Sequence, residues 1–360
     1  MRSLHFGSAM IDIITQVASE NIEQATFTNG ETSFLMLEAG RKLPAEAITT
    51  HVGGGACNTA VCLARRGWES AVLAKVGEDV GASAIRAHLT GAGVGDRLVN
   101  SAAATGTAVM VASHDRNASI FVHRGANETL TEEDLPGFEE LDLVYVAPLS
   151  NASADVYPLI ARGAKAAGAF VASNPGIRQL SSRGAVFLET LADLDLVSVN
   201  RVEAEALAPA LAGRAGADVS TPRDRLPVDP PALMQRGLLV QGLQMGLVTF
   251  LKAMQDLGPS RVVVTDGVDG AYLAGPDGVF WHPALPVDVI GSAGAGDAFC
   301  STLTAALAEG IAPPAALTEA ACNAAAAVGV VDTTSGLHNR SSLAEAAARL
   351  GPDKARRLAD

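Results

Sequence analysis

The chain has 360 residues, a formal net charge of −13 and 48% hydrophobic residues, with 36 glycines and only 4% aromatics. The negative charge excludes a general nucleic-acid or anionic-membrane surface, because both require a basic patch. Length and composition fit one main α/β domain with a substantial core and many tight turns. Any bound phosphate must then be held locally, by backbone N–H groups, a metal ion or a few basic side chains.

The first residues and the cysteines bear on the compartment. The segment MRSLHFGSAMIDII has no sustained apolar core before a cleavage-like site, so no signal peptide is expected. The four cysteines are widely spaced, without the pattern of metal ligands or of a dense disulfide framework; they are Cys57, Cys62, Cys300 and Cys322. We therefore expect buried thiols in a reducing compartment and a cytoplasmic enzyme.

A first strand is expected from residues 3–7 and 9–14, ending near Gly7 and Ser8, and Asp12 follows among apolar residues. A buried charge is kept only where it has partners, so a turn or edge-strand role and a binding role for Asp12 both stay open. Residues 15–50 are poorly periodic, with β-leaning pieces at 33–37 and 47–51. They are expected to form a lid rather than part of the core.

A glycine run, Gly53, Gly54 and Gly55, comes next. It precedes a helix expected from near Asn58 to Gly67 and a strand over residues 71–76. A flexible turn followed by an ordinary helix cap is one interpretation of this pattern. Further along, residues 107–113 and 119–123 predict a hairpin, because a polar turn at 114–117 joins two strand-like runs.

Strands and helices alternate from residue 143 onward, which predicts βαβ units and a parallel sheet. Ligands bind at the carboxyl ends of the strands in such sheets, where Asn174 and Asn200 fall. The spacing of Asn200 and Glu203 is typical of a helix cap and a first-turn acid. Both polar groups are therefore expected at one helix end, near any bound phosphate.

Residues 209–257 divide into two parts of different composition. The stretch 209–231 is rich in Pro, Gly and charge and predicts a loop, whereas the apolar run 233–254 predicts one helix. The uncharged part of this run is shorter than the ~20 residues that a membrane-spanning helix needs. A buried core helix or a dimer surface is therefore expected rather than a membrane segment. A strand over 262–265 and a turn through Gly267 and Gly270 follow.

The strongest pattern is PVDVIGSAGAGDAFC, residues 286–300. A strand-like approach through Val287 and Ile290 leads into a run of small residues, and Asp297 opens a helix. Small residues let a ligand approach the backbone, and the free N–H groups and dipole of the helix favour an anion. Asp297 is either a cap or first-turn acid, or a general base in phosphoryl transfer. A small-residue helix follows, suited to close packing, and the last twenty residues predict a short amphipathic helix.

These motifs, in this order, resemble the ribokinase-like (PfkB) family of sugar and nucleoside kinases. GAGDAF at 294–299 is similar to its carboxyl-terminal signature, GGGACNTA at 53–60 to its GGxxxNxA element, and Asn200 with Glu203 to its NxxE motif. The resemblance implies one kinase domain over 1–360, a three-layer α/β/α sandwich with a mostly parallel central sheet. It also implies a small β-sheet lid from about 13–50 and 105–124, and marks 209–245 as an atypical insertion.

The resemblance further implies an ATP-dependent enzyme that uses Mg²⁺ to transfer the γ-phosphate to a hydroxymethyl group of a sugar. Asp297 would be the catalytic base, with the backbone of Gly294, Ala295 and Gly296 as anion hole. The acceptor would be bound by Asp12, Gly53, Gly54, Gly55 and Asn58. The nucleotide would be bound by Asn200, Thr265, Gly267, Gly270 and Asn323. Glu203 would act on the magnesium through water.

Some alternatives stay open. The family's Asp-Thr before Gly-Ala-Gly is replaced here by residues 291–293, Gly-Ser-Ala, which leaves activation by a monovalent cation open. It also motivates a non-catalytic ligand-binding protein on a kinase fold as an alternative. A nucleoside kinase of the same fold would need an aromatic or apolar platform for the base, and the scarcity of aromatics favours a sugar. A homodimer is also compatible with the sequence.

Overall fold

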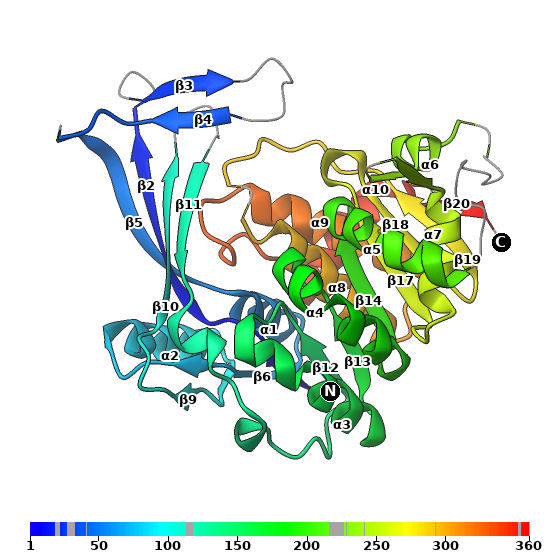
Figure 1. Cartoon of the computed structure of the whole chain (residues 1–360), viewed down its shortest axis with the longest axis horizontal. Helices are drawn as coiled ribbons and strands as arrows, with labels where there is room; N and C mark the ends of the chain where they lie inside the picture. The colour runs from blue at the N-terminus through cyan, green and yellow to red at the C-terminus, as the bar shows by residue number, and fades with distance from the viewer. Residues whose placement is uncertain are drawn as a thin grey trace.

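A ten-stranded sheet forms the centre of the molecule (Figure 1). The computed structural model describes residues 1–18, 22–26, 33–40, 42–112, 118–215, 227, 229–240, 242–291, 293–351 and 354–359. The strands are β1 Arg2–Phe6, β6 Glu69–Leu73, β8 Gly95–Asp96, β12 Leu143–Val146, β13 Phe170–Ser173, β14 Leu196–Asn200, β17 Arg261–Thr265, β18 Ala271–Gly275, β19 Gly278–His282 and β20 Arg356–Ala359. Their order is β20-β19-β18-β17-β14-β13-β12-β1-β6-β8. Neighbours from β17 to β8 are parallel, and β18, β19 and β20 extend one edge antiparallel.

Helices cover both faces of this sheet. One face carries α1 Gly55–Arg65, α8 Ala295–Ala308 and α9 Pro313–Val328, and the other carries α3 Tyr157–Ala166, α4 Ile177–Thr190, α5 Arg201–Ala215 and α7 Leu247–Gln255. Successive residues of a strand point to opposite faces, so Leu143 and Tyr145 pack under α8 and α9 while Val144 and Val146 pack under α3. The predicted three-layer α/β/α fold is confirmed.

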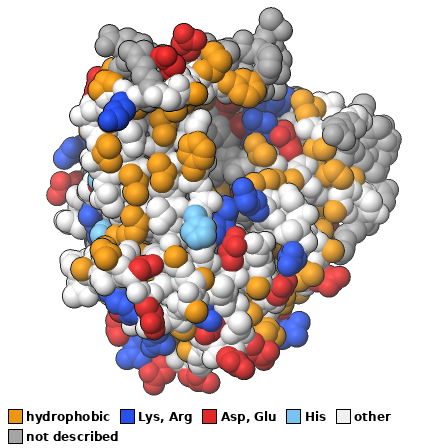
Figure 2. Space-filling view, turned by 60° about the vertical axis from the view of Figure 1, so that its left-hand side comes forward, with side chains coloured by type: hydrophobic (Ala, Val, Ile, Leu, Met, Phe, Trp, Pro, Cys, Tyr) orange, Lys and Arg blue, Asp and Glu red, His pale blue; other side chains and the backbone are white. Residues whose placement is uncertain are grey.

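A smaller sheet stands to one side of the main body (Figure 1). Its strands are β2 Met10–Val17, β5 Ala45–Gly53, β10 Gly106–Ala112 and β11 Ala118–His123, in the order β11-β10-β2-β5. The predicted hairpin is confirmed by the antiparallel pairing of β10 with β11, although its turn, 113–117, lies outside the described residues. A further pair, β3 Glu23–Thr26 with β4 Ser33–Met36, lies in the poorly periodic region, and β4 coincides with the β-leaning piece expected at 33–37. Figure 2 shows hydrophobic side chains gathered on this side of the molecule, around a hollow.

The glycine run at 53–55 leads directly into α1, which begins at Gly55 rather than near Asn58. The single strand predicted over 71–76 is split. Its first part belongs to β6, and its last residues form β7 Lys75–Val76, which pairs with β9 Val99–Asn100 in a separate ladder. α2 Val80–Gly91 follows, and the side chain of its cap residue Asp79 accepts a hydrogen bond from the backbone of Ala82.

The prediction of a loop over 209–231 is wrong for its first part, because α5 continues through Pro209 to Ala215. Burial of Leu207, Ala208 and Leu211 in the core offsets the hydrogen bond that Pro209 removes. Residues 216–226 lie outside the described part of the chain.

The single helix predicted over 233–254 is also wrong. The segment forms α6 Ala232–Arg236, a hairpin of β15 Leu238–Val240 with β16 Leu243–Met245, and then α7. Gly237 and Gly242 have φ of +67° and +86°, left-handed conformations that interrupt a helix. Leu233, Met245 and Phe250 are fully buried, which explains why the run is so apolar although it is not one helix.

The strand-like approach predicted through Val287 and Ile290 is wrong as well. Residues 283–289 are irregular, because Pro283 and Pro286 provide no N–H donors for a ladder, and Val287 and Ile290 remain exposed. At the carboxyl terminus, α10 Arg340–Leu350 is followed by β20, an edge strand that the helix-only prediction missed.

Candidate active site

The amino-terminal end of α8 presents the glycine-rich segment. Gly294, the residue before the helix, has a left-handed φ of +82°, and a Cβ there would lie 2.8 Å from the Cβ of Thr333. A Cβ on Gly296 would meet no described atom within 4 Å. The first N–H groups of the helix have no intrahelical partners, so they lie along an open stretch of backbone that suits an anion.

Asp297 lies in the first turn of α8 and is oriented by α1. Its Oδ2 accepts a hydrogen bond of 2.8 Å from Nδ2 of Asn58, whose Oδ1 accepts one of 2.7 Å from the hydroxyl of Thr333. Burial raises the pKa of Asp297, while hydrogen bonds from Asn58 and Asn174 act in the opposite direction. The carboxylate is thus held in place by amides and keeps an affinity for a proton, as a general base requires.

Asp12 approaches the same place from the small sheet. Its Oδ2 lies only 1.9 Å from where a Cβ of Gly53 would be, so a side chain at this position of the neighbouring strand β5 would displace the carboxylate. Burial, and then the negative charge of Asp297, raise the pKa of Asp12 to about 6. The two carboxylates are therefore close enough to influence each other, as they must be if they contact one bound acceptor.

The other two glycines of the run allow close packing. Gly54 has φ +99°, and a Cβ there would lie 2.4 Å from the backbone oxygen of Ser8. A Cβ on Gly55 would lie 2.8 Å from the Cβ of Ala147 and 3.9 Å from Oδ1 of Asp297. These glycines let the start of α1 approach the end of β1 and the start of α8.

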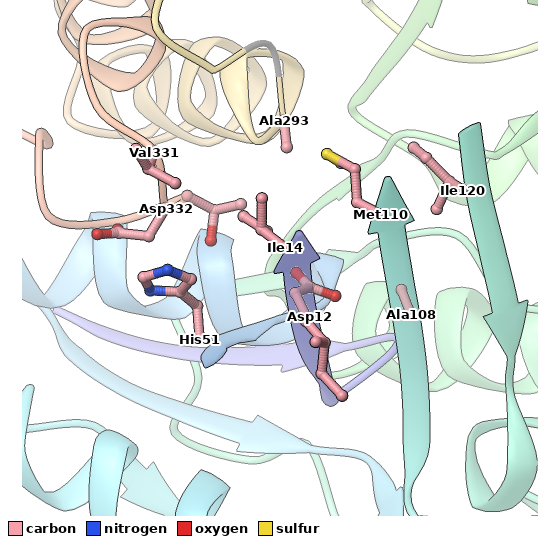
Figure 3. Close-up of a pocket in the computed structure, with 11 residues that line it drawn as sticks. Asp12, Ile14, His51, Ala108, Met110, Ile120, Ala293, Val331 and Asp332 are labelled. Atoms are coloured by element: carbon pink, nitrogen blue, oxygen red, sulfur yellow. The ribbon is translucent and has the colours of Figure 1, made fainter. Parts of the chain in front are cut away.

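A pocket of about 150 Å³ lies between the small sheet and the main body (Figure 3). The small sheet contributes Asp12, Ile13, Ile14, His51, Ala108, Met110 and Ile120, and the main body contributes Ala293, Val331, Asp332 and Thr333. Thr333 links this lining to Asn58 and so to Asp297. An acceptor bound here would lie beside the start of α8.

A second polar group lies at the carboxyl end of β14. Glu203 accepts a hydrogen bond of 2.8 Å from the backbone N–H of Asn200, and its own N–H donates one of 2.9 Å to Oδ1 of Asn200. This is the reciprocal cap that the spacing predicts. Burial raises the pKa of Glu203 to about 7, against hydrogen bonds from Asn200 and from the backbone of Ile177.

A family model described as pfkB family carbohydrate kinase matches residues 4–224 and 244–340, most of the chain. The chain belongs to the pfkB family of carbohydrate kinases. The resemblance inferred from the motifs is confirmed, and the enzyme is a phosphotransferase that acts on an alcohol group of a sugar. Residues 225–243, which include α6 and β15, lie outside the match.

Similar proteins include kinases of pentoses and ribosides. The chain is 28% identical over 252 residues to the ATP-dependent ribose-1-phosphate kinase of Halopiger xanaduensis, covering 69% of this chain and 71% of that protein. It is 28% identical over 258 residues to the aminoimidazole riboside kinase of Salmonella typhimurium, covering 70% and 72%. The structure of Arabidopsis thaliana ribokinase complexed with ribose and ATP aligns with a TM-score of 0.68 and 21% identity over 96% of this chain and 98% of that one. The last likeness shows that the kinase has the ribokinase fold.

The kinase places Thr265 opposite Asn200 in the register of β17 and β14, so both end at the same edge of the sheet. Gly267 and Gly270 follow in a turn with φ of +55° and +97°. A Cβ on Gly270 would lie 2.2 Å from the backbone oxygen of His282, whereas a Cβ on Gly267 would meet no described atom within 4 Å. The residues of this turn that were predicted to bind the nucleotide therefore lie at the same edge of the sheet as Asn200.

Asn323 does not join this edge. Its side chain is 1% exposed, and its Nδ2 donates to the hydroxyl of Thr302 at 2.8 Å and to Sγ of Cys62 at 3.3 Å. Its Oδ1 accepts from the backbone of His338 at 2.9 Å. These contacts correct the expectation that Asn323 binds the nucleotide, because its polar atoms join α8, α9 and α1 inside the fold.

Two more polar residues belong to the site: Asn174, which the sequence places at the ligand-binding edge of the sheet without a stated role, and Thr333, which no sequence signal singles out. Asn174 follows β13, and its hydrogen bond to Asp297 acts to lower the pKa of that carboxyl. The Oδ1 of Asn174 is buried without a partner among the described residues. The position of Asn174 after a parallel strand is the signal that placed it at this edge. Thr333 lies in an irregular segment after α9, and no periodicity or spacing in the sequence connects it to Asn58.

Three further observations concern the described residues only. No helix among them is long and apolar enough to cross a membrane. No group of three or more His, Cys, Asp or Glu side chains among them is arranged to hold a metal ion. All four cysteines are buried and free, as predicted.

Proposed function

We propose that this kinase transfers the γ-phosphate of ATP to a hydroxymethyl group of a sugar, with Asp297 as general base. The observation that supports it best is the placement of Asp297 in the first turn of α8, held by Asn58 and beside Asp12. Asp297 would take the proton of the acceptor hydroxyl as its oxygen bonds to the γ-phosphorus. The bond from that phosphorus to the β,γ-bridging oxygen then breaks, and ADP leaves.

The remaining predicted residues have separate roles in this proposal. The backbone of Gly294, Ala295 and Gly296 would stabilise the charge on the transferring phosphoryl group, because helix N–H groups there are free to donate. Asp12 would accept hydrogen bonds from two acceptor hydroxyls. Gly53, Gly54 and Gly55 would keep that carboxylate and the start of α1 close to the acceptor.

The carboxyl edge of the sheet suits a nucleotide with Mg²⁺. Magnesium binds through one or two carboxylates, phosphate oxygens and water, and neutralises phosphate charge when bound. Glu203 fits this role through water, because its carboxylate is partly buried and no described cation pairs with it. The orphaned Oδ1 of Asn174 is a second suitable oxygen. Asn200, Thr265, Gly267 and Gly270 would lie along the nucleotide.

The small sheet, within 13–50 and 105–124, is proposed to act as a lid on the single kinase domain. Residues from both bodies line the pocket, so movement of the sheet toward the main body would exclude water, which competes for the phosphoryl group. Free buried cysteines fit work in the reducing cytoplasm.

The proposed function is tested by ADP release from ATP and Mg²⁺ in the presence and absence of a panel of sugars, sugar phosphates and nucleosides. Stimulation by an acceptor, with formation of its phosphate ester detected by mass spectrometry, is expected. ADP release that no acceptor stimulates and that yields only inorganic phosphate would contradict the proposal.

Activity is expected to fall as the pH is lowered from 8 to 6. The pKa of Glu203 is raised to about 7 and that of Asp12 to about 6. Glu203 is therefore mostly protonated and Asp12 half protonated at pH 6, and each then loses the charge that its proposed role needs. A profile of kcat/KM for ATP against pH reports the pKa values of the essential groups in the free enzyme. Glu203→Gln is expected to remove the step near pH 7, and an unchanged step in that variant would assign it to another group.

Arg236→Ala is expected to raise KM for ATP several-fold while KM for the acceptor stays unchanged. Arg236 brings a cation from the segment outside the family match to Asp266, at 2.5 Å, and Arg201 contacts the same carboxylate at 3.1 Å. The Asp266 side chain is only 6% exposed, so loss of the Arg236 cation leaves the negative charge of Asp266 poorly compensated. We expect the adjacent turn at Gly267 to lose its fixed position as a result. Arg340→Ala, which breaks an ion pair with Glu309, is the control, and equal KM values for ATP in all three proteins would refute the role.

A further inference from the structure

The acceptor pocket is acidic. Among the described residues that line it, none is Lys or Arg, whereas Asp12 and Asp332 are both present and Asp297 lies close to Asp12. Burial opposes ionisation of Asp332, but hydrogen bonds from Ser335 and Thr334 hold the pKa of this carboxyl below its usual value. A phosphate group on the acceptor would therefore be repelled, with only His51 as a potential cation.

The lining also divides into two sides. Figure 3 shows His51 and Asp332 on one side and Met110 and Ile120 on the other, with Asp12 between them. Met110 and Ile120 are direct cross-strand partners on β10 and β11, so they present one continuous apolar surface to the pocket. Ile14 and Val331 add to the apolar part of the lining.

An apolar surface is a poor match for a bare sugar. Hydroxyl groups lie around the whole ring of a free pentose, and those turned toward Met110 and Ile120 would lose hydrogen bonds to water without replacement. A planar heterocycle attached to the sugar, in contrast, gains from burial against aliphatic side chains. Hydroxyls of the attached sugar can still reach Asp12 and the polar side of the pocket.

We propose that the acceptor is an uncharged nucleoside, with its sugar hydroxyls at Asp12 and its base against Met110 and Ile120. This inference rests on the proposed kinase function and selects among its acceptors. It assigns specificity to two residues of the small sheet that touch the acceptor without taking part in phosphoryl transfer. It also separates this enzyme from a kinase that acts on a sugar phosphate.

The test compares kcat/KM for adenosine, inosine, ribose and ribose-1-phosphate, measured by ADP release with ATP and Mg²⁺. At least one nucleoside is expected to exceed ribose about tenfold or more, and ribose-1-phosphate is expected to give no stimulation. Met110→Ala and Ile120→Ala are expected to lower kcat/KM for the nucleoside about five- to tenfold and to change that for ribose less than twofold. The matched control is Phe121→Ala, because Phe121 is adjacent to Ile120 but points to the opposite face of β11 and is 65% exposed.

Preferred phosphorylation of ribose or ribose-1-phosphate would overturn the inference and leave the kinase function standing. So would an equal loss for nucleoside and ribose in the Ile120 and Met110 variants. If no acceptor supports turnover, the proposed function itself fails. Calorimetric titration of adenosine and of ribose into the native protein then measures the binding preference of the pocket without turnover. Binding of adenosine no tighter than that of ribose would overturn the inference.

Discussion

Asp297→Asn is expected to lower kcat by about 10²- to 10⁴-fold, the usual contribution of a general base. The substitution preserves the shape of the side chain but removes its capacity to take the proton of the acceptor. In the native protein, Asn58 donates to Oδ2 of Asp297 at 2.8 Å, and burial keeps the pKa of this carboxyl raised. KM for ATP is expected to change little, because the backbone of Gly294 and Gly296 remains in place.

Steady-state kinetics with the best acceptor measures this effect, and single-turnover kinetics shows whether the chemical step has slowed. Asp277→Asn is a matched control, since Asp277 is exposed in the turn between β18 and β19. Native kcat in the Asp297 variant would refute its role as base. A variant of Asn58 to Ala is expected to lose less than the Asp297 variant, because it frees the base without removing it.

Gly53→Ala is expected to raise KM for the acceptor by tenfold or more. A Cβ at this position would lie 1.9 Å from Oδ2 of Asp12, and an approach that close forces the carboxylate away from its place in the pocket. The nucleotide residues lie on other strands, so KM for ATP is expected to stay near the native value. Kinetics with each substrate varied in turn measures the two constants separately.

Two controls accompany the Gly53 variant. Gly91→Ala adds the same methyl group in α2, where a Cβ meets no described atom within 4 Å. Thermal unfolding of both variants shows whether the fold is retained. A folded Gly53 variant with native acceptor KM would mean that Asp12 does not bind the acceptor.

The local parts of the site could be predicted from the sequence because their signals lie within a few residues. The cap formed by Asn200 and Glu203 needs only a spacing of three residues, and the glycine-rich start of α8 needs only its own small side chains. The alternation of strands and helices after residue 143 likewise determined the parallel sheet. Where local signals conflicted, prediction failed: the apolar run 233–254 has the composition of a helix, but Gly237 and Gly242 interrupt it.

Contacts between distant segments were decided by the tertiary structure. The hydrogen bond between Asn58 and Asp297 joins residues 239 apart, and the one between Thr333 and Asn58 joins residues 275 apart. No spacing along the chain encodes such pairs, because they depend on how α1 and α8 pack on the sheet. Asn323 shows the same limit. The sequence places it on a helix, but the packing of α9 directs its side chain into the core. The sequence by itself determined which helix ends and strand ends carry the chemistry, and the packing decided which of those side chains meet.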